Sequence, residues 1–398
     1  MQHRIIVLGA GYTGAVAAGR LARRLHADDV AITLVNAEPD FVERVRMHQL
    51  AAGQDLRPRP FSEMFAGTGV ELRLAKVTGI DVDTRTVTVT DAHGAQELTY
   101  DSLVYALGSG WNTQGVPGTA EHAHDIAGRP GALRLRERLA GLDSGAPVVV
   151  VGGGLTGLEA ATEIAEARPD LDVALAARGT LGDWLSPKGR AHVRKVCAGL
   201  GITVHENTAV TGVEADHVTT ADGVSVPAAV TVWTTGFAVH PIAEATTLEV
   251  NGTGQIVVDG TMRSVSHPDV YAIGDAAMAM GPGDKPLRMS CASGTPSAWQ
   301  AADSIAARLT GGKLPAMPLR YFNQCISLGR RDGLIQYVTA DDRSVRAALT
   351  GRFAALYKEL VCKGAAWGVV NPMLGMPTRG RRLTRDGSGT TQAVHESA

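Results

Sequence analysis

The chain contains few aromatic residues and almost no net charge. Aromatics make up 5% of its 398 residues, and 38 Lys and Arg nearly balance 40 Asp and Glu, so the formal charge is -2. A chain without a basic excess has no bulk attraction for nucleic acid, and we expect no nucleic-acid partner. The length allows two or three domains, and the abundance of alanine, valine and glycine favours parallel sheets packed against helices.

Cysteine is scarce too, and long apolar segments are absent. Cys197, Cys291, Cys325 and Cys362 form no CxxC pair and no metal-ligand spacing, so we expect small core residues and no metal site. No apolar run approaches the roughly 18 residues that span a bilayer. The amino end, MQHRIIVLGAG, runs into a strand without the features of a signal peptide, which favours a cytoplasmic protein.

Glycine is abundant, and two of its clusters share one pattern. Each cluster has the form GxGxxG between a buried apolar strand and a helix: Gly9, Gly11 and Gly14 in the first, and Gly152, Gly154 and Gly157 in the second. Such glycines allow a tight turn, close approach of the backbone to a pyrophosphate, and close packing of helix on strand. The helix N-terminus offers N–H groups to the phosphates. We therefore predict an α/β fold with two Rossmann-like dinucleotide-binding domains.

The ends of the next strands carry the residues expected near each ribose, about 20 residues beyond the glycines. After the first motif these are Asn36 and Glu38, and either side chain can bind ribose hydroxyls. After the second motif they are Ala176, Ala177 and Arg178. An arginine can accommodate a 2′-phosphate, or it can be a solvated surface residue, so NADPH and NADH are both candidates.

A third motif indicates which site holds which cofactor. The segment HPDVYAIGDAA, from His267, contains a strand that ends in Gly274 and Asp275. Here the chain resembles the large flavoprotein group that has two dinucleotide-binding domains, in which this aspartate hydrogen-bonds FAD. The segments LVYALGS, with Gly108, and VWTTGF, with Gly236, resemble the two glycine-containing crossovers of the group. The resemblance implies FAD in the first site and NAD(P)H in the second.

The same resemblance implies a split FAD domain around an inserted NAD(P)H domain. Alternating residues from Val77 to Tyr105 predict antiparallel strands with a DAHG turn. Further on, YFNQCISLG and LIQYVT predict a hairpin around GRRDG, with a helix from about Ser344. The expected units are FAD domain 1–110 and 245–312, NAD(P)H domain 111–244, C-terminal α+β domain 313–378, and a disordered tail 379–398.

Three segments are most similar to type II NADH:quinone oxidoreductases and their soluble bacterial relatives: FVERVRMHQLAAG, GLTGLEAA and CISLGRRDGLIQ. The resemblance implies that Glu159 lies beside the nicotinamide, and a surface carboxylate without a role is the alternative. Direct hydride transfer to the flavin requires alignment rather than an acid or base. Disulfide-reducing relatives carry a cysteine pair where this chain has none, from Phe41 to Gln54, so we expect an acceptor reduced without protein thiols.

Polar residues in two segments are further candidates. Arg44, Arg46 and His48 lie where the chain is expected to pass the flavin. A cation there would stabilise the reduced, anionic flavin, or it would form structural salt bridges. His48 is also a candidate proton donor to the acceptor. Quinone-reducing relatives carry glutamines on the helix after the second FAD segment, where this chain has Trp299 and Gln300, so Gln300 is a candidate acceptor contact or a packed helix residue.

The C-terminal segment GRFAALYKELVCKGAAWGVV predicts an amphipathic helix, with Phe353, Leu356, Leu360 and Trp367 at helical spacing. Such a stripe can lie on a lipid surface, cover the flavin domain or form a dimer contact, and membrane docking is the less favoured of these.

Together these features predict an FAD-dependent NAD(P)H dehydrogenase that reduces a quinone or quinone-like small molecule. We expect it in the cytoplasm or at the inner face of the membrane. Two alternatives stay open: a flavin oxidoreductase that acts on one metabolite, and a redox-responsive NAD(P)H- and FAD-binding protein.

Overall fold

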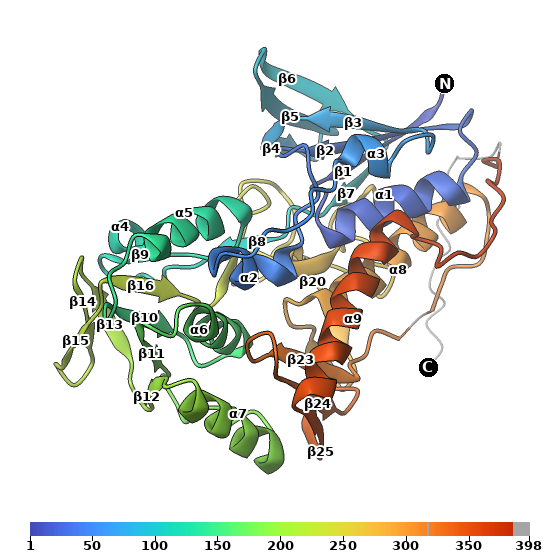
Figure 1. Cartoon of the computed structure of the whole chain (residues 1–398). Helices are drawn as coiled ribbons and strands as arrows, with labels where there is room; N and C mark the ends of the chain where they lie inside the picture. Colours follow the sequence, from blue (N-terminus) through green and yellow to red (C-terminus); the bar gives the residue numbers. More distant parts are fainter. Residues whose placement is uncertain (317, 385–398) are drawn as a thin grey trace, which may run out of the picture.

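The computed structural model describes residues 1–316 and 318–384. A parallel sheet of five strands, in the order β19-β7-β1-β2-β3, forms one part of it (Figure 1). Its strands are Val270–Ala272, Ser102–Tyr105, His3–Leu8, Val30–Asn36 and Val70–Leu74. The runs of Val, Ile and Leu suit strands that are buried on both faces. Because β19 pairs with β7, residues near 270 complete a sheet that the amino-terminal residues begin.

Two long helices lie side by side on this sheet (Figure 1): α1, Tyr12–Arg24, and α8, Cys291–Leu309. Alanine and glycine on the buried face of α1 let the helices approach closely. Arg20 and Arg24 of α1 both pair with Asp303 of α8, at N–O distances of 2.7 and 2.8 Å. Helix α8, which follows the motif at Asp275, is thereby joined to the first Rossmann-like unit.

A second parallel sheet has the order β12-β11-β10-β16-β9. Its strands are Thr203–His205, Asp172–Ala176, Pro147–Val151, Val230–Trp233 and Ala123–His124. Three helices pack around it: α5, Arg129–Ala140; α6, Leu155–Ala167; and α7, Pro187–Gly199. Ser186 starts α7, because its Oγ accepts a hydrogen bond from the backbone N–H of Gly189 and a proline follows it. The predicted α/β fold with two Rossmann-like sheets is confirmed.

Antiparallel strands extend both α/β parts. The predicted strands around the DAHG turn are confirmed as the sheet β4-β5-β6. The connection between the parts is another antiparallel pair, in which Phe237, Ala238 and Val239 face Trp111, Gly110 and Ser109. A third antiparallel sheet has the order β13-β14-β15. The strands of these sheets and of the connecting pair are β4, Lys76–Asp81; β5, Thr86–Asp91; β6, Gly94–Thr99; β8, Ser109–Trp111; β17, Phe237–Val239; β13, Val210–Val213; β14, His217–Thr220; and β15, Ser225–Pro227.

The C-terminal part is a sheet of three antiparallel strands and one helix, α9, Arg352–Val370. The predicted hairpin is confirmed by the pairing of β23, Asn323–Ser327, with β24, Gly333–Val338. The helix expected from Ser344 is wrong for its first turns, because Ser344–Thr350 is a strand, β25, that pairs with the second edge of β24. Since β24 is almost entirely buried, its backbone N–H and C=O groups need a partner on both edges.

Residues 379–384 contact the first Rossmann-like unit, although the sequence predicted disorder from Arg379. The backbone of Arg381 pairs with that of Leu25, and the Arg382 guanidinium lies 2.8 Å from an Asp29 carboxylate oxygen. The remainder of the predicted tail, 385–398, lies outside the described residues. The boundaries expected near residues 110, 245 and 312 stay predictions.

Short elements complete the fold: η1, Arg44–Arg46; α2, Met47–Ala51; α3, Phe61–Met64; α4, Thr119–His122; β18, Ile256–Val257; η2, Gly274–Ala276; β20, Ala277–Met278; β21, Met280–Gly281; and β22, Lys285–Pro286. In the described part of the chain, no helix has both the length and the apolar character needed to cross a bilayer.

Candidate cofactor and electron-transfer site

The first glycine turn leaves room where a pyrophosphate would lie. Gly9 has φ +89°, which a side chain rarely adopts, and a Cβ at Gly14 would collide with the carbonyl oxygen of Gly9. These two glycines therefore bring helix and strand together. A Cβ at Gly11 would meet no protein atom within 4 Å. Gly11 is also the N-cap of α1 and has no side-chain oxygen, so the first N–H groups of the helix are available to phosphate oxygens.

Asn36 closes this turn from the end of β2. Its Oδ1 accepts a hydrogen bond from the backbone N–H of Ala10 at 2.9 Å, and its Nδ2 donates to the carbonyl of Glu38 at 2.8 Å. Both amide atoms thus hold the loop in place, whereas the Glu38 side chain is exposed. Glu38 is therefore the better placed of the two predicted residues to bind ribose hydroxyls.

Asp275 lies in a polar group formed by three segments. Ser109 Oγ donates to its Oδ2 at 2.6 Å, and Arg44 Nη1 lies 3.7 Å from the same oxygen. Arg44 also donates to Ser109 Oγ at 3.2 Å, and a Cβ at the preceding Gly108 would lie 3.9 Å from Arg44 Nη1. Burial lowers the pKa of Arg44, and Asp275 opposes this effect. Hydroxyl, carboxylate and guanidinium groups near a glycine turn fit the ribityl and phosphate groups of FAD.

Gly274 and Gly236 are placed at bends near these segments. Gly274 has φ +66°, and its N–H donates to Ser297 Oγ at 3.1 Å, which ties the motif to α8. Gly236 has φ +76° and lies between β16 and β17, next to the strand pair that connects the two parts.

The second glycine turn repeats the first. A Cβ at Gly157 would collide with the carbonyl oxygen of Gly152, while a Cβ at Gly154 would meet no protein atom within 4 Å. Beyond β11, Ala177 is buried and Arg178 is exposed. The second glycine turn therefore has an exposed arginine at the end of the following strand. Arg178 can bind a 2′-phosphate there or remain in solvent.

Glu159 is buried at the junction of α6, α2, β23 and α9. Its Oε1 accepts a hydrogen bond from the backbone N–H of Ser327 at 3.0 Å and lies 2.9 Å from Lys358 Nζ. Its Oε2 lies 3.8 Å from His48 Nδ1. Lys358 also donates to the carbonyl of Cys325 at 3.0 Å. Glu159 is therefore a paired carboxylate in the interior and not a free surface group.

The pKa values of its partners follow from this burial. Burial alone would lower the pKa of Lys358, but the contact with Glu159 outweighs it and the pKa is raised. Burial lowers the pKa of His48 to about 4, although Glu159 opposes the shift. At neutral pH the lysine is charged and the imidazole is neutral. A neutral imidazole still has one N–H donor and one acceptor nitrogen, so it can transmit a proton.

Arg46 and Gln300 are held by contacts within the protein. Arg46 lies 3.0 Å from Glu43 and 2.9 Å from Glu359, an arrangement that fits the salt-bridge alternative. Gln300 is 2% exposed, and its Nε2 donates to the carbonyls of Gly260 and Pro315. Contact between this amide group and an acceptor would require these bonds to break. Trp299 packs beside Arg20 of α1, whose guanidinium lies 5.8 Å from the indole centroid.

The four cysteines are free thiols, and Cys291 does not fit the expectation of a core residue. Cys197 and Cys362 are buried and Cys325 is half-buried, but Cys291 is exposed at the start of α8. Burial raises the pKa of Cys325 to about 11, and burial also raises the pKa of Cys362. These two thiols are therefore protonated at neutral pH, a form that is a poor nucleophile.

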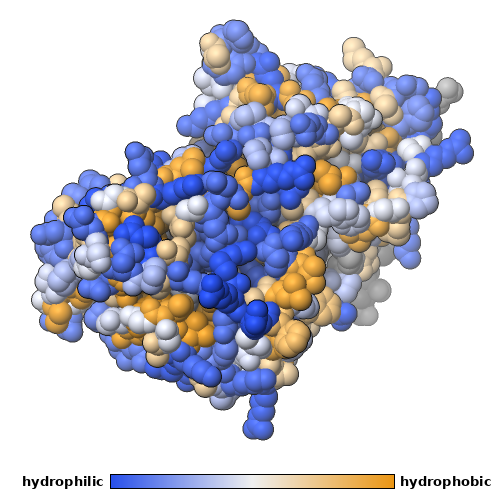
Figure 2. Space-filling model, in the orientation of Figure 1, coloured by the Kyte–Doolittle hydropathy of each residue, from blue (hydrophilic) through white to orange (hydrophobic). Residues whose placement is uncertain are grey.

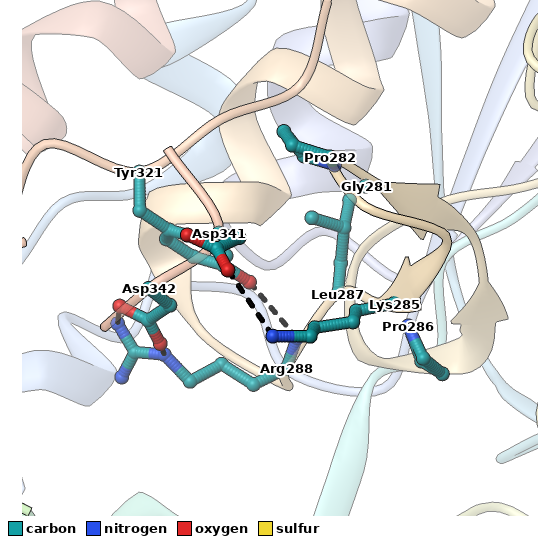
Figure 3. A pocket seen from close by; sticks show the side chains of 9 residues that line it. All are labelled: Gly281, Pro282, Lys285, Pro286, Leu287, Arg288, Tyr321, Asp341 and Asp342. Atoms are coloured by element: carbon teal, nitrogen blue, oxygen red, sulfur yellow. Dashed lines mark hydrogen bonds and ion pairs between the residues drawn. The ribbon is translucent and has the colours of Figure 1, made fainter. Parts of the chain in front are cut away.

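Two cavities lie away from the glycine turns. One, of about 80 Å³, is lined by β21, β22 and the loop of the C-terminal sheet (Figure 3), where Lys285 Nζ lies 3.1 Å from Asp341. Ligand pockets commonly have about 300 Å³ or more, so this one is too small for a dinucleotide. The other, of about 570 Å³, lies at the amino ends of β10 and β11, beside Pro147 and Asp172. Dinucleotides bind at the carboxyl ends of such strands.

Sequence reasoning missed Lys358, Ser109 and Glu163. Lys358 lies within the amphipathic segment that begins at Gly351, among its apolar residues. Its spacing contained a usable signal, because Ala354, Lys358, Cys362 and Ala366 recur every four residues and thus share one helix face.

Comparisons with known proteins agree with this geometry. A family model described as pyridine nucleotide-disulphide oxidoreductase matches residues 3–306. An NADH dehydrogenase-like protein of Mycobacterium tuberculosis is 30% identical over 351 residues, which cover 82% of this chain and 86% of the relative. A demethylphylloquinone reductase of Synechocystis is 26% identical, with coverage of 89% and 92%.

Solved structures share the fold. NDH2 from Plasmodium falciparum has a TM-score of 0.77 at 15% identity and covers 95% of this chain and 99% of its own. The sulfide:quinone oxidoreductase of Aquifex aeolicus has a TM-score of 0.73 at 19% identity, with coverage of 98% and 99%. The chain belongs to the pyridine nucleotide-disulphide oxidoreductase family, and it is an oxidoreductase that uses FAD and NAD(P)H.

Proposed function

We propose that the chain passes electrons from NAD(P)H to a quinone or quinone-like small molecule without using protein thiols, and that this acceptor binds beside α9. The observation that carries the proposal is the pairing of Glu159 with Lys358 beneath a hydrophobic helix face. Two kinds of relative support it by name, a demethylphylloquinone reductase and type II NADH:quinone oxidoreductases.

The two faces of α9 differ sharply. One face places Lys358, Cys362 and Ala366 against the rest of the protein. On the other, Phe353 is 77% exposed and Leu360 is 60% exposed, and Figure 2 shows hydrophobic residues gathered over this helix. The apolar stripe therefore does not cover the flavin domain within the described structure. It offers a hydrophobic approach for an apolar acceptor to the charged pair below.

The residues of the site supply binding and alignment. FAD, when bound, accepts a hydride from NAD(P)H and gives two electrons to the acceptor. Gly11 and Gly154 leave space for the two pyrophosphates, and Arg44 and Asp275 bind polar groups of FAD. Ser327 and Lys358 hold the Glu159 carboxylate in one orientation. It can therefore position the nicotinamide or the acceptor without a further loss of side-chain entropy.

We also propose that the stripe on α9 contacts a lipid surface, where apolar quinones dissolve. Leu356 and Trp367, 57% and 49% exposed, lie on this stripe, and Arg352 and Lys363 are exposed on the same helix, where they can approach anionic headgroups. Co-sedimentation with anionic vesicles, lost in Leu356→Glu with Leu360→Glu, is the expected result. Loss of a dimer in the double variant, without vesicle binding by the parent, would assign the stripe to a second copy of the chain.

The acceptor is tested by reducing the flavin anaerobically and mixing it with several oxidants. We expect rapid reoxidation by a naphthoquinone or benzoquinone and slow reoxidation by a disulfide or polysulfide. Reoxidation only by one metabolite would support the tailoring enzyme instead, and slow reoxidation by every oxidant would support the redox-responsive binding protein.

A further inference from the structure

Helix α6 carries a second buried carboxyl group, Glu163, one turn beyond Glu159. Its side chain is 1% exposed. Its Oε1 accepts a hydrogen bond from the amide of Gln54, while its Oε2 has no hydrogen-bond partner among the described residues. A buried carboxylate normally satisfies both oxygens, because an unpaired one carries a desolvation cost.

The charged groups around Glu163 stabilise its ionised form only weakly. The nearest cation is Arg330, whose Nε lies 3.9 Å away on a side chain that is 40% exposed. The carboxyl groups of Glu159 and Glu166 lie on the same helix and oppose ionisation. Burial is the largest effect and raises the pKa of Glu163 to about 7. The group therefore gains and loses a proton near neutral pH.

Glu163 contacts two partly exposed residues and lies one helical turn from Glu159 on α6. On the outer side, Gln54 and Arg330 are partly exposed and border the carboxyl group. On the inner side, helix α2 packs against α6 and carries His48, whose Nδ1 faces Glu159. His48 Nε2 is also buried without a hydrogen-bond partner in the described chain. Two unpaired buried polar atoms thus lie on neighbouring elements, Glu163 Oε2 on α6 and His48 Nε2 on α2.

We propose that Glu163 relays protons from solvent at Gln54 and Arg330, through His48, to the Glu159–Lys358 pair and the acceptor. The relay rests on the proposed function. Reduction of a quinone to a quinol takes two electrons and two protons, and NAD(P)H supplies two electrons and one proton as hydride. The second proton comes from water, so Glu163 loses one proton inward and regains one from solvent in each turnover. Each proton moves between oxygen and nitrogen atoms, and no further oxidant or reductant is required.

The two half-reactions separate this role from a structural one. Transfer of hydride from NAD(P)H needs no proton from solvent, whereas reoxidation by quinone needs one. In Glu163→Gln we expect unchanged flavin reduction and reoxidation slowed by about tenfold or more, with loss of the inflection near pH 7. Glu163→Asp, which keeps the carboxyl group, should recover part of the rate. The FAD content and the reduction rate show whether each variant is folded.

Glu166→Gln is the matched control, because Glu166 lies three residues further on the same helix and accepts a hydrogen bond from the Arg330 backbone. It should leave flavin reduction unchanged and keep reoxidation at the parent rate below the pH inflection, which moves to lower pH because the Glu166 charge no longer opposes ionisation of Glu163. Equal reoxidation of the parent and Glu163→Gln at every pH would overturn the relay alone. Failure of the parent to react with any quinone would overturn the proposed function together with the relay.

A second measurement does not depend on turnover. Infrared difference spectra of the FAD-loaded protein during a pH titration should contain a protonated-carboxyl band with a midpoint of about 7. The band should be absent in Glu163→Gln and retained in Glu166→Gln. A parent protein without such a band would show that Glu163 is ionised throughout, and a permanently ionised carboxylate cannot store the proton.

Discussion

The two Rossmann-like units share a glycine turn and differ in what surrounds it. Gly9 and Gly14 stand in the same relation as Gly152 and Gly157, and in both turns the middle glycine borders open space. At the end of the next strand, however, Asn36 is bonded into the first turn, whereas Arg178 at the second is exposed. The first site has side chains fixed around it, and the second has an open rim. This contrast fits a cofactor that stays bound and a substrate that exchanges.

The helices after the turns differ as well. The positions of Val16 and Arg20 in α1 correspond to those of Glu159 and Glu163 in α6, counted from the last glycine of each motif. Helix α1 uses this face to pack against α8 through Arg20 and Asp303. Helix α6 presents acids to the junction with the C-terminal part. The same supersecondary unit thus packs against another helix in one case and, in our proposal, carries the proton relay in the other.

The largest expected effect comes from adding one methyl group to either turn. Gly14→Ala should abolish FAD retention, because its Cβ would collide with backbone of the same turn, while Gly157→Ala should retain FAD and lose reduction by NAD(P)H. FAD content and flavin-reduction rate measure the two outcomes. In Gly11→Ala and Gly154→Ala the methyl group meets no protein atom, so these variants should fold and lose cofactor affinity only because the methyl group enters the space left for the pyrophosphate. Loss of FAD only in Gly157→Ala would reverse the assignment of the sites.

Lys358→Met should destabilise the protein by about 3–5 kcal/mol, because it leaves Glu159 buried without its cation. The double variant Lys358→Met with Glu159→Gln should recover much of this loss. Denaturant unfolding of the parent, both single variants and the double variant measures the coupling. Additive losses would mean that the two side chains do not depend on each other.

Glu163 should make stability fall as pH rises. Its folded pKa of about 7 lies above the ordinary 4.5, so the folded chain holds a proton that the unfolded chain releases. The resulting stabilisation is complete below pH 4.5 and is lost as pH rises through about 7, a change of about 3 kcal/mol. Glu163→Gln should remove this fall in unfolding free energy, and Glu166→Gln should not. If the unfolding free energies of the parent and of Glu163→Gln changed in parallel with pH, Glu163 would not be the source of the pH dependence.

Asp275→Ala should weaken FAD binding by about 10- to 100-fold, since a charge-assisted hydrogen bond contributes about 1.5–3 kcal/mol. The apparent nicotinamide affinity of the remaining holoenzyme should change less. Equilibrium dialysis of FAD and flavin-reduction kinetics give the two values. The opposite ranking would place Asp275 in the second site.

The smallest expected effect concerns the choice of nicotinamide cofactor. No carboxylate follows β11, and we expect Arg178 to favour NADPH over NADH by about tenfold. Arg178→Ala should raise the apparent constant for NADPH alone. Strong selectivity of the parent for NADH would show that Arg178 faces solvent.

The parts predictable from the sequence are local. Strand, glycine turn and helix are adjacent in the chain, so spacing identified both nucleotide units, and the family resemblance pointed to the motif at Asp275. The part of Asn36 in holding the first turn could not be predicted, because its bond to Ala10 depends on how β2 approaches the turn. The strand at 344–350 was missed because its partner edge on β24 is formed only in the folded sheet.

The buried acid cluster could not be derived in the same way. Glu159, His48 and Lys358 are far apart in sequence, and their contacts depend on the packing of three separate segments. Glutamate on a helix is usually a surface residue, and nothing in the pattern of α6 distinguished Glu163 from Glu166. Only the positions of α2 and the 328–333 loop leave Glu163 buried and Glu166 partly exposed.

An anaerobic titration with a two-electron reductant tests most directly whether electrons bypass protein sulfur. The absorbance of the bound FAD is followed while the reductant is added stepwise. We predict complete flavin reduction by one equivalent per FAD, since the thiols are free and remain outside the electron path. Consumption of two equivalents per FAD, with new free thiols in the reduced protein, would reveal a redox-active disulfide and contradict the account.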